Sequence, residues 1–255
     1  MQTKIAPVAA VPQASAIVIR ETPVPAGTAA ASERGALAYW FDIAPEVREQ
    51  WLDWYQHDHM PSRVGTTFVS GRCYEALHAG LSHMVLFETT EPEALLAPSY
   101  VALLRQVSDA DRQRRGWYSN TIRVTCHVGA RIGKGTGSVL GVVRVAGALA
   151  NAADVRRCLV DDVVPALARV PRIGAAWLIE NDPALRARMD AVRVTGHQDG
   201  SADWAVLIEG GHQADITSAM KRLDDIASWG ALGLGNAATL EQYRLLYTMS
   251  QSDRG

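Results

Sequence analysis

The sequence predicts an α+β fold of two ferredoxin-like βαββαβ repeats whose antiparallel sheets pack face to face. Two observations predict it. Strand and helix patterns follow one another in the same order twice, and short motifs of the first half recur in order in the second half. A βαββαβ unit carries both helices on one face of its sheet, so the other face needs a cover. A second copy within the chain supplies that cover.

Hydrophobic periodicity defines the elements of the first repeat. The runs ALAYWFDI, HMVLFET and SNTIRVTCHV have the apolar and β-branched character of strands. Between these runs lie segments in which apolar residues recur every three to four positions, which predicts helices. The predicted order is strand 36–43, helix 45–59, strand 67–77, strand 83–89, helix 91–107 and strand 119–128.

The second repeat follows the same order. Its predicted elements are strand 138–146, helix 151–169, strands 173–180 and 203–209, helix 212–229 and strand 239–249. DHMP at 58–61 matches DVVP at 162–165, and MVLFE at 84–88 matches AVLIE at 205–209. The main departure is a longer loop at 181–202.

These boundaries divide the chain into five segments. We expect the Ala- and Pro-rich leader to be loosely ordered, although Ala-Ile-Val-Ile at 16–19 could pair as an extra strand. The Gly-rich ARIGKGTGS is typical of a flexible connector. The segments are leader 1–34, first repeat 35–129, linker 130–137, degenerate second repeat 138–250 and tail 251–255.

Composition excludes several classes of function. The 25 basic and 27 acidic residues form no long run of one sign, which argues against nucleic acid or an anionic membrane as partner. Three cysteines without CxxC spacing favour a reducing compartment, so we expect a cytoplasmic protein without a structural metal site. No segment approaches the roughly 18–20 uninterrupted apolar residues of a membrane helix. Serine hydrolase, nucleotide-binding and zinc protease motifs are missing from the sequence.

Chemistry-bearing residues gather in WLDWYQHDHMP at 51–61. On a helix, Trp51, Tyr55 and His59 share one stripe with Asp58 beside it, while His57 points elsewhere. Residues two apart on a helix are about 200° apart, so the two histidines could share a metal ion only if the last turn unwinds.

The role of His59 has two interpretations. It could cap the helix end, or it could act as a general acid/base, because imidazole exchanges protons near neutral pH. The second repeat has Val163 at the matching position and keeps Asp162 and Pro165 around it. A residue that the fold required only as a cap would be expected in both copies, which favours chemistry in the first.

Arg72 and Tyr74 are two apart on a predicted strand and so face the same side of the sheet. If that side lines the pocket between the sheets, Arg72 could orient an anionic group and Tyr74 could donate a proton. A rim ion pair and a core aromatic residue are the alternative. Arg112, Arg114 and Arg115 form a basic run that we expect to be exposed.

The stretch WLDWYQHDHMPSRVGTTFVSGRCYEA, followed by HMVLFETTEPEALLAPSYVALL, resembles the EthD-like branch of the dimeric α+β barrel superfamily. The shared features are a helix ending in His-x-Pro and a strand that begins near Gly-x-x-Tyr. The resemblance covers about residues 36–126 and persists over 138–250 only at the level of fold. It implies cofactor-free decarboxylases, dehydratases and isomerases of aromatic or lactone substrates, or small oxygenases. More distant relatives bind haem.

We therefore predict a cofactor-independent lyase or isomerase for a small aromatic or cyclic substrate. His59 moves the proton, Asp58 or His57 tunes it, and Trp51, Tyr55, Arg72 and Tyr74 bind the substrate. One alternative is a haem enzyme with His197 or His212 as axial ligand; another is a non-catalytic binding or assembly protein with aromatic residues filling the barrel. Any homo-oligomer is expected to use outer surfaces, since the chain supplies both sheets.

Overall fold

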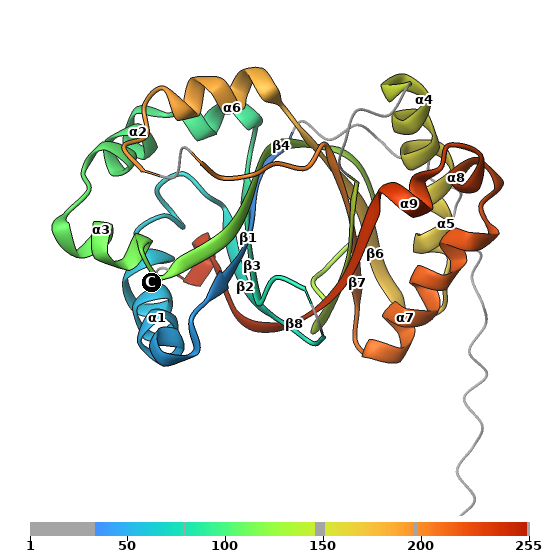
Figure 1. The fold of residues 1–255 in the computed structure, drawn as a ribbon, viewed down its shortest axis with the longest axis horizontal. Helices are drawn as coiled ribbons and strands as arrows, with labels where there is room; N and C mark the ends of the chain where they lie inside the picture. Colours follow the sequence, from blue (N-terminus) through green and yellow to red (C-terminus); the bar gives the residue numbers. More distant parts are fainter. Residues whose placement is uncertain (1–33, 79, 146–150, 196–197, 254–255) are drawn as a thin grey trace, which may run out of the picture.

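The computed structural model describes residues 34–253 except 79, 146–150 and 196–197 (Figure 1). The expected extra strand at 16–19 lies outside the described residues. The first half contains β1 (Gly35–Ile43), α1 (Arg48–Trp54), β2 (Ser70–Ala76), β3 (His83–Thr89), α2 (Pro98–Arg105), α3 (Asp109–Arg115) and β4 (Tyr118–Gly133). A π-helical segment, Tyr55–His59, continues α1, and short 3-10 turns lie at Pro45–Val47 and Pro92–Leu96.

The second half repeats this pattern with additions. Its elements are β5 (Val139–Val145), α4 (Ala152–Arg157), α5 (Val164–Ala168), β6 (Ile173–Asn181), α6 (Pro183–Asp190), β7 (Trp204–Gly210), α7 (Gln213–Lys221), α8 (Ala227–Ala231), α9 (Leu234–Ala237) and β8 (Ala238–Ser250). A second π-helical segment, Cys158–Val163, joins α4 to α5. Further 3-10 turns lie at Arg222–Asp225 and Gln251–Asp253.

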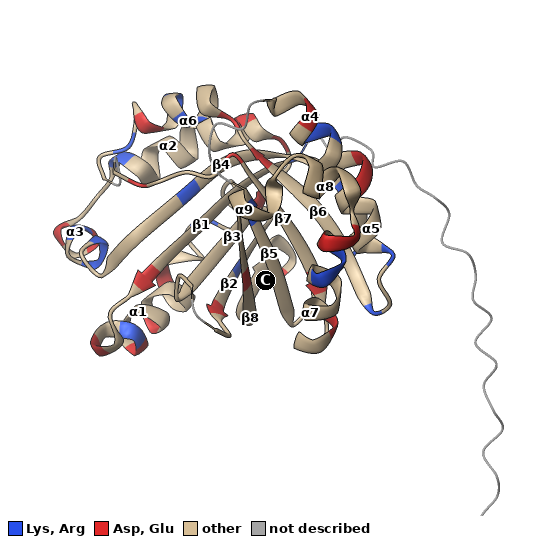
Figure 2. Ribbon diagram, turned by 45° about the vertical axis from the view of Figure 1, so that its right-hand side comes forward, with Lys and Arg blue, Asp and Glu red and all other residues tan. Residues whose placement is uncertain are grey.

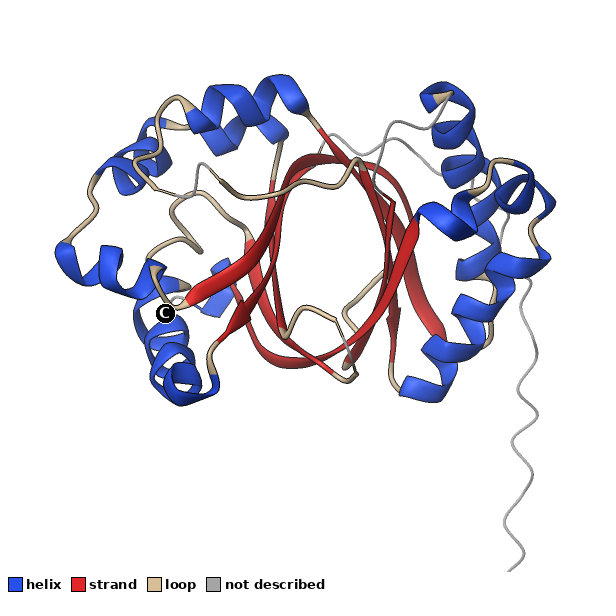
Figure 3. Cartoon of the chain, viewed as in Figure 1, coloured by secondary structure: helices blue, strands red, loops and turns tan. Residues whose placement is uncertain are grey.

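The predicted fold class is confirmed. Each half is an antiparallel sheet with its strands in the order fourth, first, third, second, that is β4-β1-β3-β2 and β8-β5-β7-β6. The sheets do more than pack face to face, because β2 pairs with β8 and β4 pairs with β6. All eight strands therefore close into one barrel, with the helices outside it (Figure 3).

Two long strands make this closure. The first part of β4 pairs with β1 and its last part with β6, while β8 pairs first with β5 and then with β2. Consequently Ala130 to Gly133, expected to belong to the flexible linker, are the end of β4. A strand must be long to serve two sheets in this way, and β4 has 16 residues and β8 has 13.

The alternation of side chains along the strands creates three buried layers. Along β1, Ala36, Ala38 and Trp40 point into the barrel, and Leu37 and Phe41 point outward under the first-half helices. A third layer lies between the second-half sheet and its helices. Acidic and basic residues are interspersed along the outer helices (Figure 2). Within the described part of the chain, no helix has the length and apolar character needed to cross a membrane.

The barrel interior is full. Its largest side chains are Trp40, Tyr74, Trp177 and Tyr243, each with almost no exposed surface. Arg72 is also buried inside, where it donates hydrogen bonds to Glu88 of its own half and, at 2.6 Å, to Glu209 of the other half. Charges so deeply buried are tolerated only when paired.

This ion pair cluster generates a stability prediction. Replacing Arg72 by Met should lower the free energy of unfolding by about 3–5 kcal/mol at pH 7, because Glu209 would be left buried without a cation, whereas Glu88 would keep its ion pair with Arg131 at 3.2 Å. Burial already raises the pKa of Glu209, and loss of Arg72 would raise it further above its unfolded value, so the loss of stability should shrink as the pH falls and Glu209 becomes protonated. Urea unfolding at pH 5 and pH 7 measures this. Arg244→Met, at an exposed ion pair with Glu75, is the control and should cost below about 1 kcal/mol.

Candidate functional site

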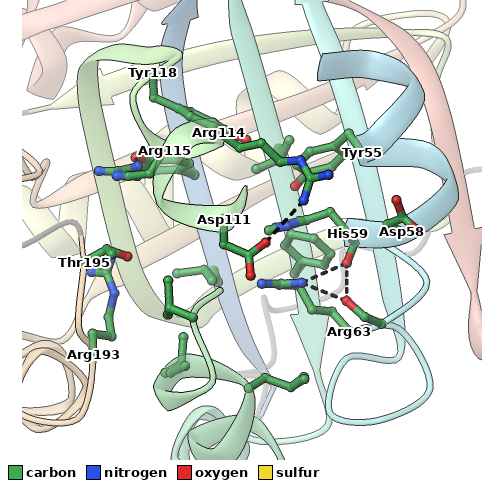
Figure 4. Close-up of a pocket in the computed structure, with 18 of the residues that line it drawn as sticks. Tyr55, Asp58, His59, Arg63, Asp111, Arg114, Arg115, Tyr118, Arg193 and Thr195 are labelled. Atoms are coloured by element: carbon green, nitrogen blue, oxygen red, sulfur yellow. Dashed lines mark hydrogen bonds and ion pairs between the residues drawn. The ribbon is translucent and has the colours of Figure 1, made fainter. Parts of the chain in front are cut away.

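A cavity of 510 Å³ lies outside the barrel, between the first-half sheet and the helices that cover it. Its floor is the outer face of the sheet, with Leu37, Tyr39, Val85, Phe87 and Tyr118. The π-helical segment that follows α1, together with α2 and α3, forms its walls (Figure 4). The expected pocket between the two sheets is thus replaced by packed side chains, and the cavity is on the opposite face of the sheet.

The π-helical segment sets the direction of His59. The amide of Met60 donates to the carbonyl of Tyr55 at 2.9 Å, five residues back, so the helix widens in its last turn. π-Helical turns of this kind are frequent at functional sites. The His59 ring stacks on Tyr55 with centroids 4.8 Å apart and lies 4.5 Å from the Trp54 ring. All three side chains line the cavity.

The His59 imidazole does not cap the helix. The hydroxyl of Ser62 and the guanidinium of Arg63 donate to the carbonyl oxygen of His59, at 2.8 Å and 3.0 Å. Neither ring nitrogen has a hydrogen-bond partner among the described residues. Burial lowers the pKa of His59 well below 6.5, and Arg63 and Arg114 lower it further. The ring is therefore a neutral base with a free nitrogen in the cavity.

Two arginines stand near this base. Arg114 lies 3.5 Å from Asp111 and stacks over the Trp54 ring at 5.0 Å. Arg63 has no carboxylate within ion-pair distance in the described structure. Asp111 is fixed by a capping box with Ser108 at the start of α3. The basic run expected to be exposed thus places Arg114 and Arg115 in the wall of the cavity.

The other residues of the WLDWYQHDHMP cluster divide by the face they occupy. Asp58 lies at the exposed rim of the cavity. His57 points to solvent and its Nδ1 contacts the Asp53 carbonyl at 2.9 Å. Trp51 is fully buried behind Tyr55, where its indole donates to the Tyr118 hydroxyl at 2.6 Å. Trp51 therefore supports the cavity without lining it.

Arg72 and Tyr74 do not reach the cavity, which corrects their predicted placement. They share a face of β2, but that face is the barrel interior, whereas the cavity is on the outer face. Arg72 is held by Glu88 and Glu209 and lies 3.4 Å from the Tyr74 hydroxyl. Burial raises the pKa of the Tyr74 hydroxyl, so it stays neutral.

The second half also contributes to this site. The longer loop of the second repeat forms α6 and crosses to the first half, where Leu185 and Met189 join the first-half core (Figure 1). Its continuation brings Arg193 and Thr195 to the cavity. A repeat-based alignment gives no sign of this contribution, because the loop has no counterpart in the first repeat.

Of the two histidines expected as haem ligands from the second half, the structure describes one. The layer between the second-half sheet and its helices is packed around Leu159, Leu167 and Trp229, and a pocket of 350 Å³ lies at its edge beside Trp229. His212 is exposed at the start of α7, and His197 lies outside the described residues. Over the described ranges, no three His, Cys, Asp or Glu side chains are grouped to hold a metal ion.

Comparison with known proteins gives the fold. No family model and no curated protein sequence matches the chain. An anthrone oxidase-like protein of known structure matches with a TM-score of 0.53 at 10% identity, over 86% of this chain and 93% of that one. A protein described as a candidate monooxygenase, from Lactobacillus acidophilus NCFM, matches with a TM-score of 0.51 at 9% identity, over 86% and 97%. These neighbours are dimeric α+β barrel proteins. The chain has their fold.

The environment of His59 generates a prediction on its titration. In histidine NMR spectra, His59 should stay neutral as the pH falls through the range in which His127 becomes protonated, since burial and two arginines disfavour its charged form. His127 is the internal reference, because the Glu180 carboxylate raises its pKa above 6.5. His59→Gln assigns the resonance. Titration of His59 at or above the pKa of His127 would contradict the described environment.

Proposed function

We propose that the protein is a cofactor-independent lyase or isomerase that moves a proton on a small aromatic or cyclic substrate. The observation that carries this proposal is a neutral, unpaired imidazole that faces a cavity with an apolar floor and stands beside the two cations Arg63 and Arg114. A base must be unprotonated to act, and the lowered pKa of His59 keeps it so at neutral pH.

The chemistry can be written with this chain's own residues. A planar substrate lies against the Tyr55 ring and the apolar sheet floor. His59 takes a proton from the carbon next to a carbonyl, and the electron pair of that C–H bond moves to the carbonyl oxygen. Arg63 and Arg114 stabilise the resulting enolate. These cations also lower the pKa of His59, so base and oxyanion site are electrostatically linked.

The fate of the enolate separates the two reaction types. In an isomerase, the His59 imidazolium returns the proton to a different carbon. In a lyase, the electron pair expels a leaving group and the proton leaves with it. Burial raises the pKa of the Tyr55 hydroxyl well above its usual value, so Tyr55 remains a neutral hydrogen-bond donor and does not act as a base. Asp58 at the rim would tune His59, and His57 would contribute little.

A cofactor-free oxygenase is a second candidate, favoured by the neighbours described as a candidate monooxygenase and an anthrone oxidase-like protein. The first step would be the same. The carbanion would then add to O₂ and form a peroxide on the ring carbon. The His59 imidazolium would protonate this peroxide to a hydroperoxide, and loss of water from the hydroperoxide would leave a carbonyl. Consumption of O₂ during turnover, followed with an oxygen electrode, distinguishes this reaction from lyase or isomerase chemistry.

We further propose that the first half belongs to the EthD-like branch and that the chain arose by duplication. The shared strand order and the π-helical segments at matching positions support duplication. The aromatic filling of the barrel is what a binding or assembly protein would show, but the cavity outside the barrel favours catalysis.

The central prediction concerns His59→Gln. With 2-tetralone, a cyclic aromatic ketone, as a probe in D₂O, the wild type should catalyse exchange of the α-hydrogens, which ¹H NMR follows. The variant should lose about 10²- to 10⁴-fold in rate, because glutamine keeps polarity and reach but cannot accept the proton. His57→Gln is the matched control two residues away and should change the rate little. Equal rates for wild type and His59→Gln would exclude His59 as the base.

Arg63→Met tests the oxyanion role separately. Removing this cation should raise the pKa of His59 toward 6.5 and slow exchange by about 10²- to 10³-fold. The rate should be compared at about pH 8.5, where His59 is neutral in both proteins, so that the loss reports on the enolate alone. Arg112→Met is the control, because Arg112 is exposed and paired with Asp109 on the same basic run. A shifted pKa with an unchanged rate would show that Arg63 does not contact the oxyanion.

A further inference from the structure

The cavity has a second charged end, opposite His59. Figure 4 shows Arg193, Thr195 and Arg115 on one side of the cavity and His59 and Arg63 on the other. Arg123, from β4, also lines this second end. The proton-transfer chemistry proposed above uses none of these arginines. They therefore need another explanation.

Positive charge is in excess at this end. Among the described residues, the four guanidinium groups of Arg115, Arg123, Arg186 and Arg193 pair with two carboxylates. Asp190 pairs with Arg123 and lies 2.8 Å from Arg186 and 3.1 Å from Arg193. Asp199 lies 3.2 Å from Arg193 and 3.5 Å from Arg123, and it also pairs with Arg115. Tyr39 contacts Arg115 and Asp199, but burial raises the pKa of its hydroxyl, which therefore adds no negative charge.

Water cannot readily offset this excess. The side chains of Arg123 and Arg193 are only 4% and 11% exposed. The Nε atom of Arg123 is buried and makes no hydrogen bond within the described structure. Burial, together with the neighbouring charges of Arg193 and Arg186, lowers the pKa of Arg123 to about 10, as expected where like charges crowd. A buried cationic cluster with an unsatisfied donor is stabilised by an anion.

The carboxylates on the rest of the cavity wall do not supply that anion. Asp111 is already bound by Ser108 and Arg114, and Asp58 is at the exposed rim beside His59. Leu103, Leu104 and Val107 also line the cavity and give it apolar surface. A ligand that spans the cavity would thus have an apolar body, with its acid group at the arginine end.

We propose that this end of the cavity is a subsite for the carboxylate of the substrate, formed by Arg123 and Arg193 with Arg115. The substrate class is then an aromatic or cyclic acid whose reacting carbon lies at His59. This assignment rests on the proposed function for the site, but the binding of the acid group does not require turnover. A planar carboxylate matches the fork of a guanidinium, and a dianionic phosphate would be repelled more strongly by Asp190 and Asp199.

Calorimetric titration of three probes that share the naphthalene ring tests the subsite on the wild-type protein. The probes are 2-naphthoate, 2-naphthamide and 2-naphthyl phosphate. The carboxylate should bind about tenfold or more tightly than the neutral amide, since a hydrogen bond to a charged group is the difference between them. Equal affinity of acid and amide, or tightest binding of the phosphate, would overturn the proposal.

Substitution locates the acid group. Arg193→Gln should weaken the binding of 2-naphthoate about tenfold or more and leave the binding of 2-naphthamide unchanged. The affinity of Arg193→Lys for 2-naphthoate should lie between those of the wild type and Arg193→Gln. The control is Arg188→Gln on the same helix, because Arg188 is exposed and pairs only with Glu93 away from the cavity. Circular dichroism checks that each variant is folded. If a variant does not fold, the comparison of the three probes on the wild-type protein still tests the subsite. Loss of amide and acid binding together would contradict the subsite.

The binding experiments can succeed or fail independently of the proposed proton transfer. His59→Gln should bind 2-naphthoate with the affinity of the wild type, because the base is at the other end. If the acid preference is found but α-hydrogen exchange does not depend on His59, the subsite stands and the proton-transfer proposal fails. If exchange depends on His59 but acid and amide bind equally, the subsite alone fails.

Discussion

The hydrogen bonds that β4 and β8 make to both halves are the constraint on which the rest of the structure depends. Each strand completes its own four-stranded sheet and then continues along an edge of the other. Every strand edge is thereby paired, which removes the exposed edges that an open sheet presents. Closure also fixes the size of the interior, and that interior is filled by aromatic side chains and by charges paired across the halves.

Because the interior is full, the space available for a ligand depends on how the helices cover the outer face. In the second half, Leu159, Val163 and Trp229 fill the layer between sheet and helices. In the first half, Tyr55 and His59 stand at the positions that match Leu159 and Val163, and a cavity remains beside them. Two similar scaffolds thus differ in the side chains that they place at the same π-helical turn and in the space left beside it.

The order of the elements could be predicted from the sequence because it depends on local periodicity, and the predicted strand 83–89 coincides with β3. The closing of the barrel could not, because edge pairing depends on how far β4 extends past its own sheet. For the same reason the side of the sheet that holds the cavity was not predictable. The two-residue spacing of Arg72 and Tyr74 shows that they share a face, but it does not show whether that face is the interior.

Contacts between residues that are distant in the sequence could not be predicted either. Arg114 and Arg115 have the appearance of a solvated run until α3 is folded against Trp54 and Tyr39. Arg193 lies in a loop whose only sequence signal was its unusual length. His59, which lines the cavity, could be selected from the sequence because the second repeat supplied a comparison, with Val163 in the same frame. Comparison of the two repeats was therefore informative at positions present in both, and it gave no information where one repeat has an insertion.

The crossing of α6 has an evolutionary consequence. In a barrel assembled from two identical subunits, two-fold symmetry would place every substitution and every insertion in both halves at once. A single chain is free of that symmetry. One half can lengthen a loop that packs against the other half, without the other half gaining the same loop. In this protein the second half contributes α6 and the segment that follows it, and the first half contains the cavity.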